Sequence, residues 1–357
     1  MPVVHQLIIG AAEGDAITGM ALDIQNGLKT LGSSEIYAYW RHSDRLTEAV
    51  RDVHEMPLAG YDALMYHLSI GYEPVHEILM QVKVPVILCY HNVTPAELYR
   101  RNEPEFAADL DLGRQEISDL RDRVVLAIAD SHFNSLDLHQ AGYDNVHVVP
   151  AGFRPSRLAD EEYDVGLLTE MRRRYPNGYV VAVGQVLPHK RIEQLMQTLH
   201  LLNSTFWGNI GLVICGVQRQ PAYFNALLRH RSNCAMVDVH FAGAVSDREL
   251  ATYMRGASAY LGMSDHEGFC FPPIEAASMG IPVVIKGAGA IPESIGDGAL
   301  VLPSHAGPVL AAEALQEVLS NRETRSTLIA RGFRRVRELE LQQHGEETVR
   351  LVREVLR

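Results

Sequence analysis

The 357-residue sequence lacks several features that would place it in a special class of protein. It has only four cysteines, and no two of them have CxxC spacing, which argues against a disulfide framework and against a cysteine-bound zinc ion. No apolar run approaches the roughly 18 uninterrupted residues that a membrane-spanning helix requires. The first 15 residues have no basic segment followed by a long apolar stretch, so they do not resemble a signal peptide. These absences predict a cytoplasmic protein with reduced thiols.

An excess of basic residues is also missing. The formal net charge is −12, which argues against non-specific binding to nucleic acids but leaves room for a local basic site. The apolar content of 47% and the charged content of 21% are those of an ordinary globular protein. A chain of this length predicts about two domains.

Short apolar runs alternate with longer helical patterns along the chain, and the series begins again after a break at 151–177. This rhythm predicts two Rossmann-like, doubly wound α/β domains that face each other across a cleft. We place the first domain at 1–160 and the second at 161–335, with a charged helical segment at 336–357 that packs back toward the first domain. The predicted strands are 3–10, 35–40, 62–68, 85–92, 124–131 and 146–152, and then 179–186, 211–216, 237–243, 258–264 and 282–287.

Ligands of doubly wound sheets bind beyond the carboxyl ends of the strands, so the residues that follow each strand are the candidates for a site. In the first half, Gly14 and Asp15 lie in a glycine-rich turn before a helix, although an ordinary turn explains them equally well. The turn is not GxGxxG, which disfavours a dinucleotide site. His91 follows the predicted strand 85–92, and His67 ends a neighbouring one, which favours a functional role for His91 over simple packing.

In the second half, Lys190 and Arg191 stand where a helix is predicted to begin, beside free backbone N–H groups. They predict a phosphate site or a solvated pair of charges, and their positions alone do not separate these two alternatives. Glu267 occupies a tight turn after a strand, and Glu275 falls in the first turn of the next helix. A first-turn glutamate is common without any function, but two carboxylates one loop apart can also accept hydrogen bonds from two polyols.

These segments resemble the retaining glycosyltransferases of family 4, which have the two-domain B-type fold. The resemblance rests on Glu267-Gly-Phe-x-Phe-Pro-x-x-Glu275-Ala followed by Gly-Ile-Pro-Val-Val, and on four further segments of the sequence. In the first half, GDAITG, YHLSIG and YHNVTPAELY are similar to a branch that acts in bacterial polysaccharide assembly. The four further segments are VHVVPAGF (146–153), VGQVLPHKRIE (183–193), HFAGAVSDREL (240–250) and GAGAIPESIGDGALVL (287–302).

The resemblance implies a role for each candidate. Glu267 contacts the hydroxyls of the donor sugar, Glu275 binds the ribose, and Lys190 holds the diphosphate. His91 lies close to the transferred sugar, and the Gly14–Asp15 turn closes the cleft. Many relatives have Gly-Arg where this chain has Gly184-Gln185, so either Arg191 replaces that arginine or Lys190 and helix amides act alone. The backbone amides that line the pocket belong to Gly268, Phe269, Cys270 and Phe271.

The implied reaction moves a hexose from a GDP-, UDP- or dTDP-linked donor to a saccharide or lipid-linked acceptor, with retention and without a cofactor. The Asp109-Leu110-Asp111 string lies in a helical segment and points to two faces, so no metal is expected. A lipid-linked acceptor implies transient contact with the inner face of the membrane. A nucleotide-sugar epimerase and a binding protein without turnover are the alternatives, and the missing GxGxxG makes a dinucleotide-dependent oxidoreductase a weak third.

Overall fold

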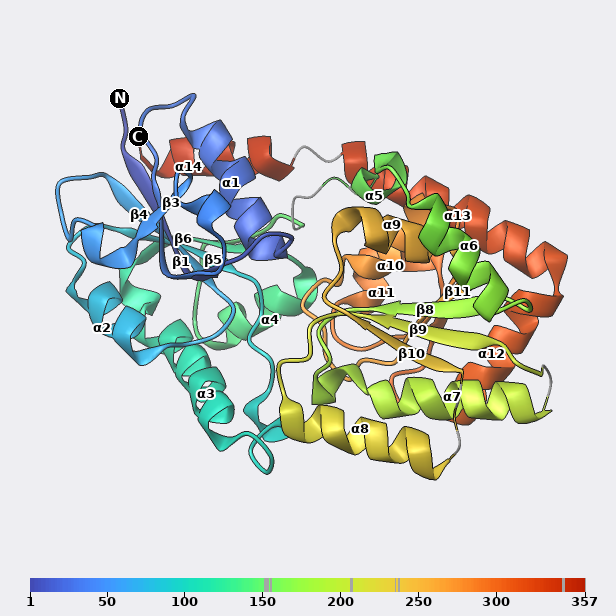
Figure 1. The fold of residues 1–357 in the computed structure, drawn as a ribbon. Helices are drawn as coiled ribbons and strands as arrows, with labels where there is room; N and C mark the ends of the chain where they lie inside the picture. Colours follow the sequence, from blue (N-terminus) through green and yellow to red (C-terminus); the bar gives the residue numbers. More distant parts are fainter. Residues whose placement is uncertain are drawn as a thin grey trace. The chain divides into compact units, whose positions relative to one another are not determined.

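The computed structural model describes residues 1–150, 154, 156–205, 208–234, 236, 238–341 and 344–356. These residues form two compact units (Figure 1). The first unit comprises Met1–Phe153 together with Gln343–Arg357, and the second comprises Arg154–Gln342. The chain therefore returns to its first unit for the last helix, whereas residues 336–341 belong to the second.

The sheet of the first unit has seven parallel strands in the order β3-β2-β1-β4-β5-β6-β7. The strands are β1 Val4–Ala11, β2 Ile36–Arg41, β3 Val50–Asp52, β4 Ala63–Leu68, β5 Val86–Tyr90, β6 Val124–Ala129 and β7 Val146–Val148. The helices are α1 Ala16–Leu28, α2 Glu73–Gln81, α3 Pro104–Asp119, α4 His132–Gln140 and α14 His344–Val355, and the 3₁₀ turns are η1 Asp44–Leu46, η2 Val53–Glu55, η3 Ala96–Leu98 and η4 Arg121–Arg123.

Alternate residues of the strands in this sheet enter different apolar clusters, because successive side chains of a strand point to opposite faces. In β4, Met65 packs in a cluster with α1 and α14, whereas Leu64 packs in one with α2 and α3. A Cβ at Gly27 of α1 would lie 2.6 Å from Val349 Cγ2, so glycine permits the close approach of α14.

The sheet of the second unit has six parallel strands in the order β10-β9-β8-β11-β12-β13. The strands are β8 Tyr179–Val183, β9 Gly211–Cys215, β10 Val239–Gly243, β11 Ala259–Gly262, β12 Val283–Lys286 and β13 Leu300–Leu302. The helices are α5 Arg157–Asp160, α6 Val165–Arg174, α7 Ile192–Thr205, α8 Pro221–Asn233, α9 Asp247–Gly256, α10 Pro272–Ser278, α11 Ile291–Ile295, α12 Pro308–Ser320 and α13 Arg322–Leu341, with 3₁₀ turns η5 Pro188–Lys190 and η6 Gly296–Gly298.

The two doubly wound sheets confirm the predicted fold class, and the cleft between the halves stays a prediction. Each predicted strand has a counterpart, but the three-residue strands β3 and β13 were missed. Residues 151–152 and 237, which were assigned to predicted strands, lie outside the described part of the chain. So does Phe153 of the segment 146–153.

In each sheet the chain first adds strands on one side of its first strand and then crosses over to add the rest on the other side. This reversal defines one switch point in each sheet. In the first unit this switch point lies between β1 and β4, and in the second it lies between β8 and β11. Connections leave the carboxyl ends of two such strands in opposite directions and open a crevice there. The residues that follow these strands are therefore the best placed to bind a ligand.

Candidate active site

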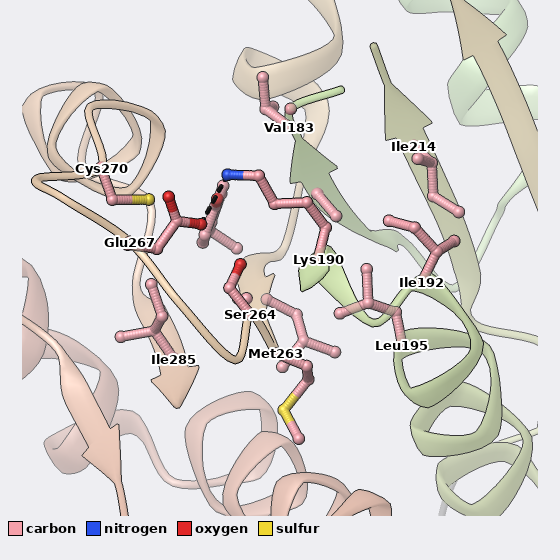
Figure 2. Close-up of a pocket in the computed structure, with 15 residues that line it drawn as sticks. Val183, Lys190, Ile192, Leu195, Ile214, Met263, Ser264, Glu267, Cys270 and Ile285 are labelled. Atoms are coloured by element: carbon pink, nitrogen blue, oxygen red, sulfur yellow. Dashed lines mark hydrogen bonds and ion pairs between the residues drawn. The ribbon is translucent and has the colours of Figure 1, made fainter. Parts of the chain in front are cut away.

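An ion pair links the segments that follow the two strands at the switch point of the second unit. Nζ of Lys190, at the end of η5, lies 2.6 Å from Oε1 of Glu267 in the loop after β11 (Figure 2). Chain direction brings the pair together, because β8 leads into η5 and its sheet neighbour β11 leads into the glutamate loop. The two residues are 77 positions apart in sequence.

The ion pair lies over a small pocket with largely apolar walls. Its cavity volume is about 20 Å³, which is room for about one water molecule. The cavity is therefore too small to hold a sugar in this structure, and a ligand the size of a hexose would have to displace the pair or bind above it. Other lining residues include Gly184, Ile192, Leu195, Tyr260, Met263, Ser264, Cys270 and Ile285.

The pair keeps both partners charged. Burial by itself raises the pKa of Glu267, but the positive charge of Lys190 and hydrogen bonds from Lys190 and Ser264 outweigh it, so the pKa lies below its ordinary value. Burial likewise lowers the pKa of Lys190, and the Glu267 carboxylate reverses the effect and leaves the pKa raised. The site therefore offers one fixed cation and one fixed anion at neutral pH.

The loop from Gly268 to Phe271 turns sharply between Glu267 and α10. Cys270 has φ of 77°, a left-handed conformation that is uncommon for a residue with a side chain. Burial and the nearby charge of Glu267 raise the pKa of its thiol well above the ordinary value, so Cys270 is not a thiolate nucleophile. Phe269 and Phe271 contact each other with ring centroids 5.3 Å apart.

The backbone groups at Lys190 and Arg191 differ from the sequence-based expectation. We expected free N–H groups at a helix start, but these two N–H groups donate to the carbonyls of Leu187 and Pro188 within η5. The helix α7 begins only at Ile192, whose N–H donates to the hydroxyl of Tyr223 at 3.0 Å. The expectation was wrong because a 3₁₀ turn precedes the helix and a tyrosine from α8 caps it.

Arg191 is held by acidic neighbours. It adopts φ of 52°, and its guanidinium forms ion pairs with Asp265 and Glu193. Asp265 also pairs with Lys286 of β12, which is buried. The charge of Arg191 is therefore compensated by Asp265 and Glu193, as that of Lys190 is by Glu267.

Gly184 and Gln185 follow β8 directly. The N–H of Gly184 donates to the carbonyl of Cys215, and a Cβ at Gly184 would lie 3.7 Å from Cε of Lys190. A Cβ at Gly216 would lie 1.8 Å from the carbonyl oxygen of Gly184. The turn that carries Lys190 is thus closely packed, and Gln185 is half-buried beside it.

Glu275 lies in the first turn of α10, as the sequence predicts, but its partner was missed. Nε of Arg157 lies 3.0 Å from Oε1 of Glu275, and Nη1 of the same guanidinium lies 2.7 Å from Asp247 of α9. Burial raises the pKa of Glu275, and the charge of Arg157 offsets only part of this rise. Nothing in the sequence around Arg157 marks it, because its partners are 90 and 118 residues away.

In the first unit, His91 is part of a buried chain of hydrogen bonds. Its Nδ1 lies 2.7 Å from Asp130, and its Nε2 lies 2.9 Å from Nδ1 of His67. Nε2 of His67 lies 2.9 Å from Oε1 of Gln6 in β1. The sequence indicated both histidines at strand ends, whereas Gln6 and Asp130 were missed because each lies in or beside an apolar strand that by itself predicts only core.

The turn of Gly14 and Asp15 follows β1 in the same unit. Gly14 has φ of 72°, and a Cβ there would meet no atom within 4 Å. Asp15 is the N-cap of α1, with Oδ2 accepting from the backbone N–H of Thr18 at 2.9 Å. The cap gives Asp15 a structural role, and its predicted part in closing a cleft remains a prediction.

Within the described ranges, no group of three His, Cys, Asp or Glu side chains is arranged to hold a metal ion. The Asp109–Asp111 string lies in α3, and Asp111 pairs with Arg100. Across the same described residues, none of the helices combines the length and apolar character needed to cross a membrane.

Known proteins resemble this chain in sequence. Residues 172–335 match the family model described as Glycosyl transferases group 1. O-antigen chain mannosyltransferase B of Escherichia coli is 26% identical over 173 residues, which cover 48% of this chain and 45% of that protein. A GDP-mannose-dependent alpha-mannosyltransferase of Mycobacterium tuberculosis is 26% identical over 239 residues, 65% of this chain and 57% of the relative. The chain thus spans about half the length of these relatives.

Solved structures resemble it over the whole chain. Anabaena HepE in complex with UDP and glucose has a TM-score of 0.75 at 15% identity, covering 100% of this chain and 99% of that one. WaaG, a glycosyltransferase involved in lipopolysaccharide biosynthesis, has a TM-score of 0.71 at 14% identity, covering 98% and 99%. At such identities the likeness shows the fold alone. The chain has the fold of these B-type glycosyltransferases, and its residues 172–335 match the glycosyl transferases group 1 family model.

Proposed function

We propose that this protein is a retaining, metal-independent glycosyltransferase that moves a hexose from a nucleoside diphosphate sugar to a saccharide or lipid-linked saccharide. The observation that supports this most is the Lys190–Glu267 ion pair at the switch point between β8 and β11. It places a cation and a carboxylate where doubly wound sheets bind ligands, inside the region that matches the glycosyltransferase family model.

Donor binding would exchange the partners of this pair. The diphosphate replaces Glu267 as the anion beside Lys190, and Glu267 turns to accept hydrogen bonds from sugar hydroxyls. The pair pre-organises both groups, since neither has to change its protonation state. Glu275, oriented by Arg157, binds the ribose hydroxyls. The relatives named as mannosyltransferases favour mannose as the transferred sugar.

In the transfer step, the bond between the anomeric carbon and the diphosphate oxygen breaks and a bond to the acceptor oxygen forms on the same face. Because the new bond forms on the face that the diphosphate leaves, the anomeric configuration is retained. The acceptor proton moves to the departing diphosphate. Lys190 stabilises the negative charge that develops on the leaving group. His91 acts near the transferred sugar, and a lipid-linked acceptor would bring the protein to the inner face of the membrane.

Thermal unfolding with GDP, UDP and dTDP tests donor binding, because a ligand that binds only the folded state raises Tm by mass action. Transfer is then assayed with the matching sugar nucleotide and saccharide acceptors. Lys190→Ala and Glu267→Gln should lose transfer, whereas Lys29→Ala and Glu313→Gln, at exposed positions of α1's C-cap and of α12, should retain it. Stabilisation by none of the nucleotides, or full transfer by both site variants, would contradict the proposal.

A further inference from the structure

The hydrogen-bond chain Gln6–His67–His91–Asp130 determines how many protons lie between its four side chains. Three hydrogen bonds join these four groups, at 2.9, 2.9 and 2.7 Å, and each needs one proton. A carboxylate has no proton to give. Two neutral imidazoles bring one N–H each. The chain therefore contains one proton more than neutral histidines and an ionised aspartate supply.

The amide of Gln6 sets the direction of the first bond. Its Nε2 donates to the carbonyl of Ala21 at 2.9 Å, so Oε1 faces His67 and can only accept. Nε2 of His67 must then carry a hydrogen. Gln6 is fully buried and cannot turn toward water instead.

The second bond follows from burial. His67 is 1% exposed, so a positive charge on its ring would be costly, and burial together with the charge of His91 lowers its pKa well below the ordinary value. A neutral His67 with a proton on Nε2 has an unprotonated Nδ1, which accepts from Nε2 of His91. The ring planes lie within 10° of parallel with centroids 5.2 Å apart, which suits two rings joined edge to edge.

The third proton lies between His91 and Asp130. A free imidazole is more basic than a free aspartate carboxyl group by about 2.6 pKa units, so the proton belongs on His91. Both groups are largely buried, with 6% and 9% of the side chain exposed, and the anion compensates the cation. We propose that Gln6, His67 and Asp130 are positioning residues that hold His91 as a doubly protonated imidazolium.

This state changes what His91 can do in transfer, a consequence that rests on the proposed function. Both ring nitrogens are engaged within the first unit, so the ring does not serve as a general base. It supplies a fixed positive charge after β5, which would favour a negatively charged leaving group. The protonation state itself does not depend on any substrate.

Nitrogen-15 NMR of the histidine rings in the full-length protein, at about pH 8 where free histidine is neutral, tests the proposal. The expected spectrum has one ring with hydrogens on both nitrogens, which His91→Gln removes. His5 is the internal reference for a neutral ring, since its Nδ1 accepts from the N–H of Glu35. Asp130→Asn removes the counter-charge, so His91 should lose its Nδ1 proton.

A single protonated nitrogen on His91 in the unaltered protein would overturn the proposal, and this spectrum needs no variant beyond the one used for assignment. If His91→Gln does not fold, His67→Gln can assign the signals of the His91 ring instead, because it removes the ring that is hydrogen-bonded to Nε2 of His91. Gln6→Leu should lower kcat by about tenfold or more with little change in the donor KM. Unchanged kcat in that variant would overturn the positioning role, whereas absence of transfer in the unaltered protein would count only against the proposed function.

Discussion

Nζ of Lys190 lies 2.6 Å from Oε1 of Glu267, and each residue lies in the segment that follows one of the two strands flanking the switch point of the second sheet. The ammonium and the carboxylate thus hold each other ionised and in place before any ligand arrives. This arrangement makes the two side chains interdependent, so the effects on transfer of removing each of them should not be additive.

Glu267→Gln should lower transfer by about 100-fold or more, because a neutral amide neither restrains Lys190 nor accepts hydrogen bonds as strongly as a carboxylate. Lys190→Ala should cause a loss of similar size. The double variant should lose less than the product of the single losses, since the residues act as a unit. Steady-state kcat of the three variants checks this, with Glu313→Gln as the control. Strictly multiplicative losses would show that the pair does not act together.

The two glutamates should respond to pH in opposite ways. The pKa of Glu267 is lowered in the folded protein, so its contribution to the free energy of unfolding is present above the ordinary pKa of about 4.3 and is lost as pH falls through the folded value. The pKa of Glu275 is raised, so its contribution is present below about pH 4.3 and is lost as pH rises through the folded value.

Urea unfolding between about pH 3.5 and 7 separates these contributions. The stability gap between the unaltered protein and Glu267→Gln should narrow as pH falls. Glu275→Gln should gain stability relative to the unaltered protein as pH rises. Parallel curves for both variants would contradict the electrostatic description of the site.

Arg157→Ala should weaken nucleotide binding more than turnover. Arg157 holds Glu275 at 3.0 Å and Asp247 at 2.7 Å, and its loss leaves a buried carboxylate without its counter-charge. We expect a loss of about 1–3 kcal/mol in the free energy of unfolding and a raised donor KM. Chemical denaturation and kinetics measure both. Arg248→Ala, at an exposed position of the same helix as Asp247, should be nearly neutral.

Gly289→Ala should displace Glu267 without touching its side chain. Gly289 has φ of 59°, and a Cβ there would lie 2.3 Å from the backbone oxygen of Glu267. That oxygen also accepts from the N–H of Ala290. We expect a loss of about 1–3 kcal/mol in stability and a lower kcat. Gly307→Ala, where a Cβ meets no atom within 4 Å, is the matched control, and equal effects of the two would exclude this packing explanation.

Much of the fold could be predicted because apolar strands and helical periods are local signals. The parallel strands of both sheets, the proline-started helix α10 and the position of Glu275 in its first turn all followed from nearby residues. The start of α7 was predicted to within a residue, but its cap could not be, because the cap is a tyrosine hydroxyl from another helix. The strands β3 and β13 were also missed, and in β3 the segment Val-Arg-Asp has a single apolar residue to indicate a strand.

The sequence by itself determined the two doubly wound sheets and the residues that stand at their strand ends, since these depend on short-range patterns of apolar and polar residues. Only the tertiary structure decided their partners: Arg157 for Glu275, Asp265 for Arg191, and Gln6, His67 and Asp130 for the chain that holds His91. The physical reason is that a charge or a proton is fixed by the groups within a few ångströms of it, and parallel sheets bring those groups from distant parts of the chain.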